Sequence, residues 1–156
     1  MSLKKIKINK NYSYRYRIGI TQVNEEYDKI KVTGSNQFYN TAIKAYNQNQ
    51  IEYNESVIVY YLDKSNHIIG HNVLSEGGYD ATIIDIRMLF IGALLSKATS
   101  IILTHNHPSG NLKPSEADRS ITKECIDAGK LLKIPLLDHV IITNRGYYSF
   151  ADEGDI

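Results

Sequence analysis

Apolar and β-branched residues cluster in five short segments of the chain, which is the pattern of β-strands. Residues 100–104 (SIILT) form the most continuous of these segments and predict a strand that is buried on both faces. The turn-forming residues 64–66 (KSN) separate two other segments and predict a hairpin. We expect strands at residues 55–63, 67–74, 100–104, 136–143 and 147–150.

Three further segments carry apolar residues at the spacing of an α-helix, and they are residues 36–48, 85–96 and 115–130. The last of these begins with Ser115, a residue that favours the N-cap position, and we expect it to end near Gly129. Because strands and helices follow one another along the chain, the sequence indicates an α/β or α+β fold.

The length and composition are those of one soluble globular domain, with 156 residues, 42% hydrophobic and 22% charged. The single cysteine, Cys125, excludes an intrachain disulfide framework and is expected to be a buried apolar residue. The first residues lack the apolar region of a signal peptide, and the sequence has no uncharged run of transmembrane length. We therefore expect a cytoplasmic protein without a membrane partner.

The residues that most clearly indicate a chemical function are His105, His107 and Asp118, which lies at the start of the following helix. The two histidines are two positions apart at the end of a predicted strand, so their side chains point roughly the same way. Asp118 falls in the first turn of the next helix, and its carboxylate can turn back toward both imidazoles. Two imidazoles and one carboxylate form a three-ligand zinc site with a fourth position for water.

Each of these residues also has an ordinary structural interpretation. A single histidine is most often a surface group or a satisfied core residue, and spacing alone supports that alternative as well as it supports a metal site. Ser115 and Asp118 are similar to a capping box, in which the acidic side chain accepts from the N-cap amide. We expect capping and metal binding to compete for Asp118, because a carboxylate bound to zinc is not free to cap.

Residues 105–118 (HNHPSGNLKPSEAD) resemble the signature of the JAMM (JAB/MPN+) metallohydrolases, in which His-x-His and seven residues precede Ser-x-x-Asp. The string His-Asn-His-Pro-Ser-Gly resembles the RadC-like branch, and the resemblance covers about residues 50–154. It implies a mixed β-sheet sandwiched by helices, as in the cytidine-deaminase architecture. We expect a basic strand and helix packed on the body over residues 1–50 and a RadC-like metallohydrolase domain over residues 51–156.

The resemblance also implies a glutamate that acts as general base and opens an apolar strand ending in Leu-Asp. Glu55 fits this place, whereas Glu52 lies too early and is expected to be a solvated loop acid. By the same resemblance, Ser115 helps to hold the oxyanion of a tetrahedral intermediate. The expected activity is zinc-dependent hydrolysis of a peptide or isopeptide bond in a peptide or protein substrate, with Glu55 moving the proton.

The N-terminal segment suggests a different class of function. Residues 1–24 hold six lysines and arginines and no acid, and over residues 12–17 three tyrosines alternate with one serine and two arginines, which predicts a strand with a tyrosine face and a basic face. One interpretation is a nucleic-acid contact, and the other, which we favour, is an edge strand packed on the body. RadC-like proteins are associated with DNA repair, but residues 1–50 do not resemble the helix-hairpin-helix region that they often carry. The alternative function is therefore a DNA-associated accessory protein with a structural or vestigial metal, and the oligomeric state stays open.

Other residues have roles that the sequence leaves undecided. Asp138 and His139 match a recurring pair of the RadC-like branch and are either structural or orient a metal-bound imidazole. Asn106 and Ser109 flank the histidines and are expected to orient the loop or the substrate. The remaining histidines, His67 and His71, are expected to be exposed. A zinc deaminase site is excluded because it requires further cysteines, and no P-loop, His-Glu-x-x-His or Gly-x-Ser-x-Gly motif is present.

Overall fold

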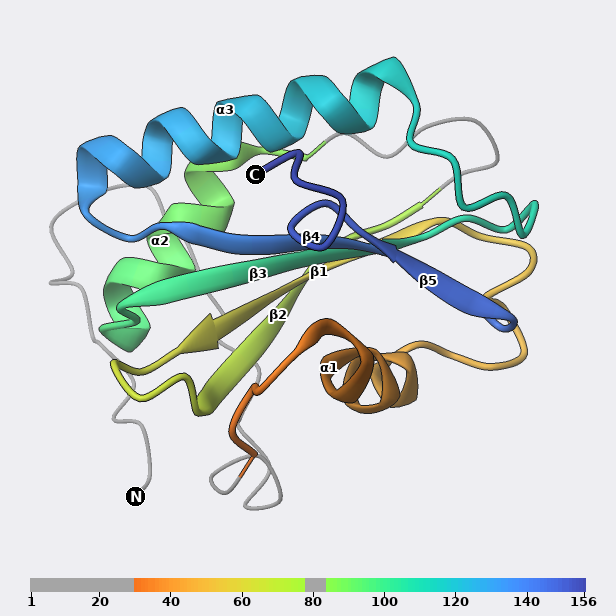
Figure 1. Ribbon diagram of the computed structural model, residues 1–156, viewed down its shortest axis with the longest axis horizontal. Helices are drawn as coiled ribbons and strands as arrows, with labels where there is room; N and C mark the ends of the chain where they lie inside the picture. The colour runs from red at the N-terminus through yellow and green to blue at the C-terminus, as the bar shows by residue number, and fades with distance from the viewer. Residues whose placement is uncertain (1–29, 78–83) are drawn as a thin grey trace, which may run out of the picture.

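A five-stranded sheet forms the centre of the computed structural model, which describes residues 30–77 and 84–156 (Figure 1). The strands lie in the order β2-β1-β3-β4-β5. β3 and β4 are parallel, and the other neighbouring pairs are antiparallel. The strands are β1 Ser56–Leu62, β2 Ile68–Glu76, β3 Ser100–Asn106, β4 Leu136–Thr143 and β5 Gly146–Ser149.

Helices cover both faces of this sheet (Figure 1). α2 (Ile86–Ser96) and α3 (Glu116–Leu132) lie on one face, and α1 (Ser35–Ala42) with the 3-10 turn η2 (Ile43–Ala45) lies on the other. Alternate residues of β1 enter the two cores, so the strand is buried on both sides: Val57, Val59 and Tyr61 pack with α2 and α3, and Ile58, Tyr60 and Leu62 pack with α1. A mixed sheet between helices confirms the expected α+β fold.

All five predicted strands are present, with small shifts of their ends. The predicted hairpin joins β1 to β2, and its turn is stabilised locally. The Oδ1 atom of Asp63 accepts from the backbone N–H of Ser65 at 2.8 Å and of His67 at 2.9 Å, while Asn66 adopts a positive φ of 63°. β3 runs two residues beyond its predicted end, which places His105 inside the strand.

The helix predicted over residues 36–48 is wrong in its second half. The α-helix ends at Ala42, one 3-10 turn follows, and the backbone of Tyr46 is extended. The side chain of Gln48 donates to the carbonyl of Ile43 at 2.8 Å and so closes the helix end. The side chain of Tyr46 is buried and lies 2.7 Å from the hydroxyl of Thr104. Packing of this tyrosine on β3 thus prevails over continued helix.

α3 extends past its predicted end near Gly129, because this glycine has a packing role and does not terminate the helix. A Cβ atom at Gly129 would lie 2.6 Å from the carbonyl oxygen of Ile134, on the segment that enters β4. The helix ends three residues later at Leu132, and Lys133 adopts the left-handed conformation with φ 59°. Gly129 therefore lets the chain turn back closely beneath the helix.

Two expectations about single side chains have different outcomes. Cys125 is buried as expected, and burial raises the pKa of its thiol to about 12. The expected exposure of His71 is wrong, because the imidazole is partly buried and its ring centroid lies 5.5 Å from that of Tyr60. Burial lowers the pKa of His71. His67 is partly exposed and lies 3.3 Å from the carboxylate of Asp63.

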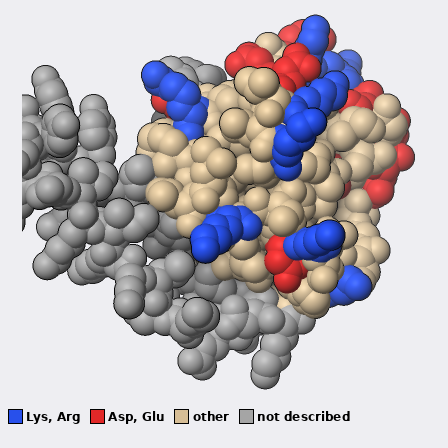
Figure 2. Space-filling view, turned by 90° about the vertical axis from the view of Figure 1, so that its left-hand side faces the viewer, with Lys and Arg blue, Asp and Glu red and all other residues tan. Residues whose placement is uncertain are grey.

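Figure 2 shows the end of the molecule at which α2 and α3 finish, and most Lys and Arg side chains on its described part are separated by uncharged atoms. Leu94 and Leu131 belong to these helix ends and are 55% and 81% exposed.

Within residues 30–77 and 84–156, no helix combines the length and the apolar character that a membrane crossing requires. The predicted N-terminal strand lies outside the described residues, so a domain division at residue 50 stays a prediction.

Replacing Gly129 by alanine tests the close approach beneath α3. Helix propensity alone would favour alanine by about 1 kcal/mol. We expect the clash with the Ile134 carbonyl to prevail, so that Gly129→Ala lowers the free energy of unfolding by about 1–3 kcal/mol. Chemical denaturation checks this, with the exposed neighbour Lys130→Ala as a control that should change stability by less than about 0.5 kcal/mol. A Gly129→Ala protein more stable than wild type would contradict the packing role.

Candidate metal centre

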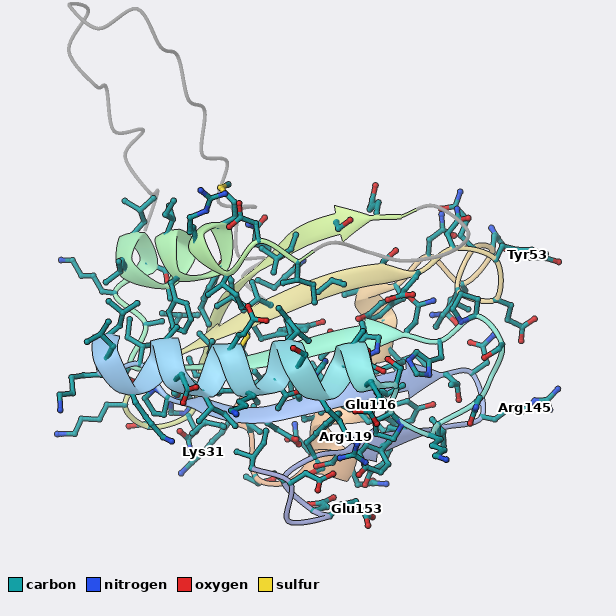
Figure 3. The ribbon with its side chains drawn as sticks, turned by 90° about the horizontal axis from the view of Figure 1, so that it is seen from above. Lys31, Tyr53, Glu116, Arg119, Arg145 and Glu153 are labelled. Carbon is teal, nitrogen blue, oxygen red and sulfur yellow. The ribbon has the colours of Figure 1, made fainter. Side chains whose placement is uncertain are left out.

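The candidate metal centre lies where β3 ends and α3 begins. β3 lies between β1 and β4 and is buried along its whole length, so His105 is only 1% exposed. The chain then passes through the loop over residues 107–114 and starts α3 at the same end of the sheet. Figure 3 shows this end, with Glu116 in the first turn of α3 and Tyr53 at the outer margin. The fold thus brings His105 on the strand, His107 directly after it and Asp118 on the helix together.

The three predicted ligands converge. The Nε2 atoms of His105 and His107 are 3.0 Å apart. The carboxylate of Asp118 places Oδ1 at 3.0 Å from His105 Nε2 and Oδ2 at 3.4 Å from His107 Nε2. One ligand atom from each residue can be chosen so that all lie within 4.8 Å of one another. The ligands of a tetrahedral zinc ion lie about 3.3 Å apart, given bonds of about 2.0–2.1 Å, so these spacings fit such an ion.

A hydrogen bond to the loop orients His107 toward this point. Its Nδ1 lies 2.6 Å from the backbone carbonyl oxygen of Asn111, which can only accept. The proton of the neutral imidazole is therefore on Nδ1, and the Nε2 lone pair faces His105 and Asp118. Lone pairs gathered around a carboxylate need protons or a cation between them, which is the property of a metal-binding group.

Asp118 belongs both to the capping box and to the group of candidate metal ligands. Its Oδ2 accepts from the backbone N–H and from the hydroxyl of Ser115, both at 2.7 Å, and the Ser115 hydroxyl accepts from the Asp118 N–H at 3.1 Å. This is a complete capping box. Oδ1 remains directed at His105. The capping box therefore occupies Oδ2 and leaves Oδ1 facing His105, and competition between the cap and a metal ion stays a prediction.

The protonation preferences of this group follow from opposing effects. Burial tends to raise the pKa of Asp118, but its contacts with the imidazoles of His105 and His107 lower it by more, and the net pKa is well below the ordinary range. Burial tends to lower the pKa of His107, but its contacts with Asp118 and the Asn111 carbonyl prevail and raise it. The arrangement therefore favours an ionised aspartate at the site.

A cleft of about 690 Å³ opens beside the three residues. Glu55, Ser115 and the exposed Glu52 line it together with the metal-binding group, as do Tyr53, Ile84, Pro108, Ser109, Asn111, Lys113, Ala117 and Ile121. Glu55 directly precedes β1, and the pairing of Val57 with His105 carries on toward Glu55 and His107. The structure thus brings all five predicted site residues to one cleft, with Glu52 at its solvated margin.

Asn106 supports this arrangement from within the sheet. Its amide group donates to the carbonyls of Ile51 at 2.7 Å and Asn54 at 2.8 Å, and its Oδ1 accepts from the N–H of Ser56 at 2.8 Å. These three contacts hold the backbone on both sides of Glu55 to β3, the strand that carries His105. The expected orienting role of Asn106 therefore concerns the loop before β1, whereas Ser109 contacts only the N–H of Asn111 at 3.3 Å.

Asp138 and His139 have separate roles, although they are adjacent on β4. The carboxylate of Asp138 accepts from the Ser149 hydroxyl at 2.6 Å and the Ala151 N–H at 3.0 Å, which is a structural role at the C-terminal turn. Burial raises its pKa. His139 contacts the metal-binding group, because its Nε2 lies 2.9 Å from Nδ1 of His105. Sequence reasoning missed Thr122, which contacts His139 at 2.6 Å and lies four residues after Asp118 on one helix face.

A family model described as RadC-like JAB domain matches residues 32–155. The chain belongs to the RadC-like JAB domain family. The matched range spans Glu55, Ser115 and the three candidate metal ligands, and the match confirms the resemblance seen in the sequence.

Several curated relatives show the same relationship. The chain is 50% identical over 100 residues to a UPF0758 protein of Flavobacterium johnsoniae, which is 64% of this chain and 44% of that protein. It is 43% identical over 102 residues to a UPF0758 protein of Thermotoga maritima, covering 65% and 46%. The match to a UPF0758 protein of Methanococcoides burtonii is 39% over 128 residues, covering 82% and 55%. The chain thus spans about half the length of the curated relatives it matches.

Residues 12–17 lie outside the described residues, so the edge strand that we favour there and the alternative of a nucleic-acid contact both stay predictions.

The raised pKa of His107 predicts how pH affects the metal-free protein. A raised folded-state pKa stabilises the fold fully below the ordinary value of 6.5, and this contribution is lost as pH rises through the folded-state pKa. We expect the difference in unfolding free energy between wild type and His107→Gln to be largest below pH 6.5 and to shrink above it. Urea titrations on chelator-treated proteins measure this difference. A difference that grew with pH would contradict the sign.

Removal of the Asn106 side chain tests its hold on the Glu55 segment. Asn106→Ala leaves one buried N–H and two buried carbonyls without their partner, so we expect a loss of about 3 kcal/mol in unfolding free energy. Asn49→Ala is the matched control, because Asn49 is exposed and its removal should be nearly neutral. Thermal melts of both variants measure the effect, and equal melting temperatures would argue against the role.

Proposed function

We propose that this chain is a zinc-dependent metallohydrolase that cleaves peptide or isopeptide bonds in a peptide or protein substrate. The observation that supports this best is the position of Glu55 and Ser115 in the same cleft as His105, His107 and Asp118. Three protein ligands that leave room for water are typical of catalytic zinc, whereas structural zinc sites are closed by a fourth protein ligand. The described residues contain no fourth His, Cys, Asp or Glu in this group.

His105, His107 and Asp118 would hold the ion. Bound zinc supplies two kinds of chemistry, since it lowers the pKa of a water molecule and polarises a carbonyl group. Two histidines and one carboxylate also bind iron(II), so the bound metal has to be identified directly.

Glu55 has the position and chemistry of the general base. It lines the cleft near the metal-binding group, and its charge acts on His107. We propose that Glu55 accepts a proton from the attacking water and then delivers it to the leaving amine. Because the hydrogen bonds of Asn106 fix the backbone on both sides of Glu55, this residue is held beside the cleft.

Ser115 would assist the oxyanion that forms as the substrate carbonyl is attacked. In the structure its hydroxyl proton is donated to Oδ2 of Asp118. To donate to an oxyanion, the hydroxyl must turn away from this carboxylate, while the backbone N–H of Ser115 keeps its own bond to Oδ2. Rotation of one hydroxyl thus links the helix cap to the chemistry, without a change in the backbone.

The residues that line the cleft support a polypeptide substrate. Its walls combine the apolar side chains of Ile84, Ala117 and Ile121 with polar groups such as Lys113 and Asn111. Such a mixture suits an extended chain whose side chains and backbone both make contacts.

Metal content and activity, measured together, test the function. We expect about one zinc per chain in wild type and in Glu55→Gln, and little in His105→Ala, by elemental analysis that also quantifies iron. Glu55→Gln keeps the size of the side chain but removes the base, so we expect turnover of peptide or isopeptide substrates to fall by about 10²–10⁴-fold. Glu52→Gln is the matched control at the margin of the cleft and should retain activity.

Two results would contradict the proposal. A Glu55→Gln protein as active as wild type would exclude Glu55 as the base. A wild-type protein that binds no metal when zinc is supplied would exclude the metallohydrolase itself.

A further inference from the structure

A series of buried hydrogen bonds links two of the candidate metal ligands, His105 and Asp118, through His139 and Thr122. Nδ1 of His105 lies 2.9 Å from Nε2 of His139, and Nδ1 of His139 lies 2.6 Å from Oγ1 of Thr122. The same hydroxyl lies 2.6 Å from the backbone carbonyl oxygen of Asp118. His105, His139, Thr122 and Asp118 are all buried. This series of hydrogen bonds thus begins at His105 and ends at Asp118.

The positions of the protons in this series of hydrogen bonds follow from what each atom can donate. A backbone carbonyl only accepts, so the single proton of the Thr122 hydroxyl points to Asp118. The Thr122 oxygen must then accept from Nδ1–H of His139. A neutral imidazole has only one N–H, so Nε2 of His139 accepts, and its donor is Nδ1–H of His105.

The surroundings of His139 favour this neutral form. Its two ring nitrogens meet an imidazole and a hydroxyl, and within the described residues neither nitrogen forms a hydrogen bond with a carboxylate. Its ring stacks on Phe150 with centroids 4.8 Å apart and an interplanar angle of 12°. A charge in this fully buried position would lose its hydration without a compensating ion pair.

We propose that His139 and Thr122 are positioning residues that hold His105 in the tautomer able to bind a divalent metal ion. With its proton on Nδ1, the imidazole of His105 presents an unprotonated Nε2 to Asp118 and His107. Neither His139 nor Thr122 contacts the ion. This inference rests on the proposed function only in taking His105, His107 and Asp118 as the metal ligands.

On this proposal, α3 contributes to the site in two ways. The helix supplies a carboxylate from its first turn, and one turn later it supplies, through Thr122, the acceptor that orders the protons. Removing that acceptor frees His139 to carry its proton on Nε2. His139 would then donate to Nδ1 of His105, and the proton of His105 would occupy the Nε2 atom that the metal needs.

Two pairs of variants separate proton ordering from simple packing. Thr122→Val keeps the shape and removes the hydroxyl, whereas Thr122→Ser keeps the hydroxyl. His139→Phe keeps a ring over Phe150 and removes the acceptor, whereas His139→Gln restores an acceptor near the place of Nε2. We expect zinc affinity to fall by about 10–100-fold in Thr122→Val and His139→Phe, with Thr122→Ser close to wild type and His139→Gln between them.

Zinc affinity is measured on the full chain by competition with a chromophoric chelator, and the tautomers by long-range ¹⁵N–¹H NMR of the metal-free protein. The spectra are taken at about pH 8, where ordinary histidines are neutral. We expect His105 and His139 both to carry the proton on Nδ1 in wild type, and Thr122→Val to lose this pattern. Thermal melts show whether each variant folds, and the wild-type spectrum decides the tautomers even if a variant does not.

Either of two results would overturn the proposal. One is a wild-type spectrum with the His105 proton on Nε2. The other is a folded Thr122→Val protein that binds zinc as tightly as Thr122→Ser does. A wild-type protein with the expected tautomers that binds no zinc would instead refute the proposed function, and the role of His139 with it, while leaving the proton arrangement intact.

Discussion

The carboxylate of Asp118 is the group through which the sheet and helix α3 meet at the site. One oxygen accepts two hydrogen bonds at the start of the helix, and the other faces an imidazole at the end of β3. An aspartate in the first turn is also stabilised by the N–H groups and dipole of the helix. The charge that a metal requires is therefore held in place by the fold before any metal binds. This explains how the protein keeps an ionised carboxylate in a largely buried position.

Much of the fold and of the ligand set could be predicted from local sequence. Strand patterning, the turn at Asp63 and the cap at Ser115 depend on nearby residues, and the structure contains all of them. His105, His107 and Asp118 lie within one short segment, so their spacing could indicate a metal group. Glu55 lies fifty residues before His105, directly ahead of another strand, and only the resemblance to a family connected it to the site.

What sequence reasoning could not supply depends on how distant strands pair. His139 reaches His105 because β4 lies parallel to β3, with Leu103 opposite His139. No local pattern in residues 136–143 fixes this alignment, and so the adjacent Asp138 and His139 could not be assigned different roles. Tyr46 is a similar case, since its contact with Thr104 ends a helix that the apolar pattern would continue. In both cases tertiary packing prevails over local preference.

The close approach at Gly129 has a consequence for a site at the far end of the same helix. Gly129 lies eleven residues after Asp118, which is about 16 Å along the helix axis. α3 is held at its start by the cap beside the cleft and near its end by contact with the backbone of Ile134. Because the helix is rigid, a displacement of its C-terminal end beneath Gly129 would tilt it and so move Asp118 at its N-terminal end. The spacing between the aspartate and the two histidines is thus set in part by packing on the opposite side of the molecule.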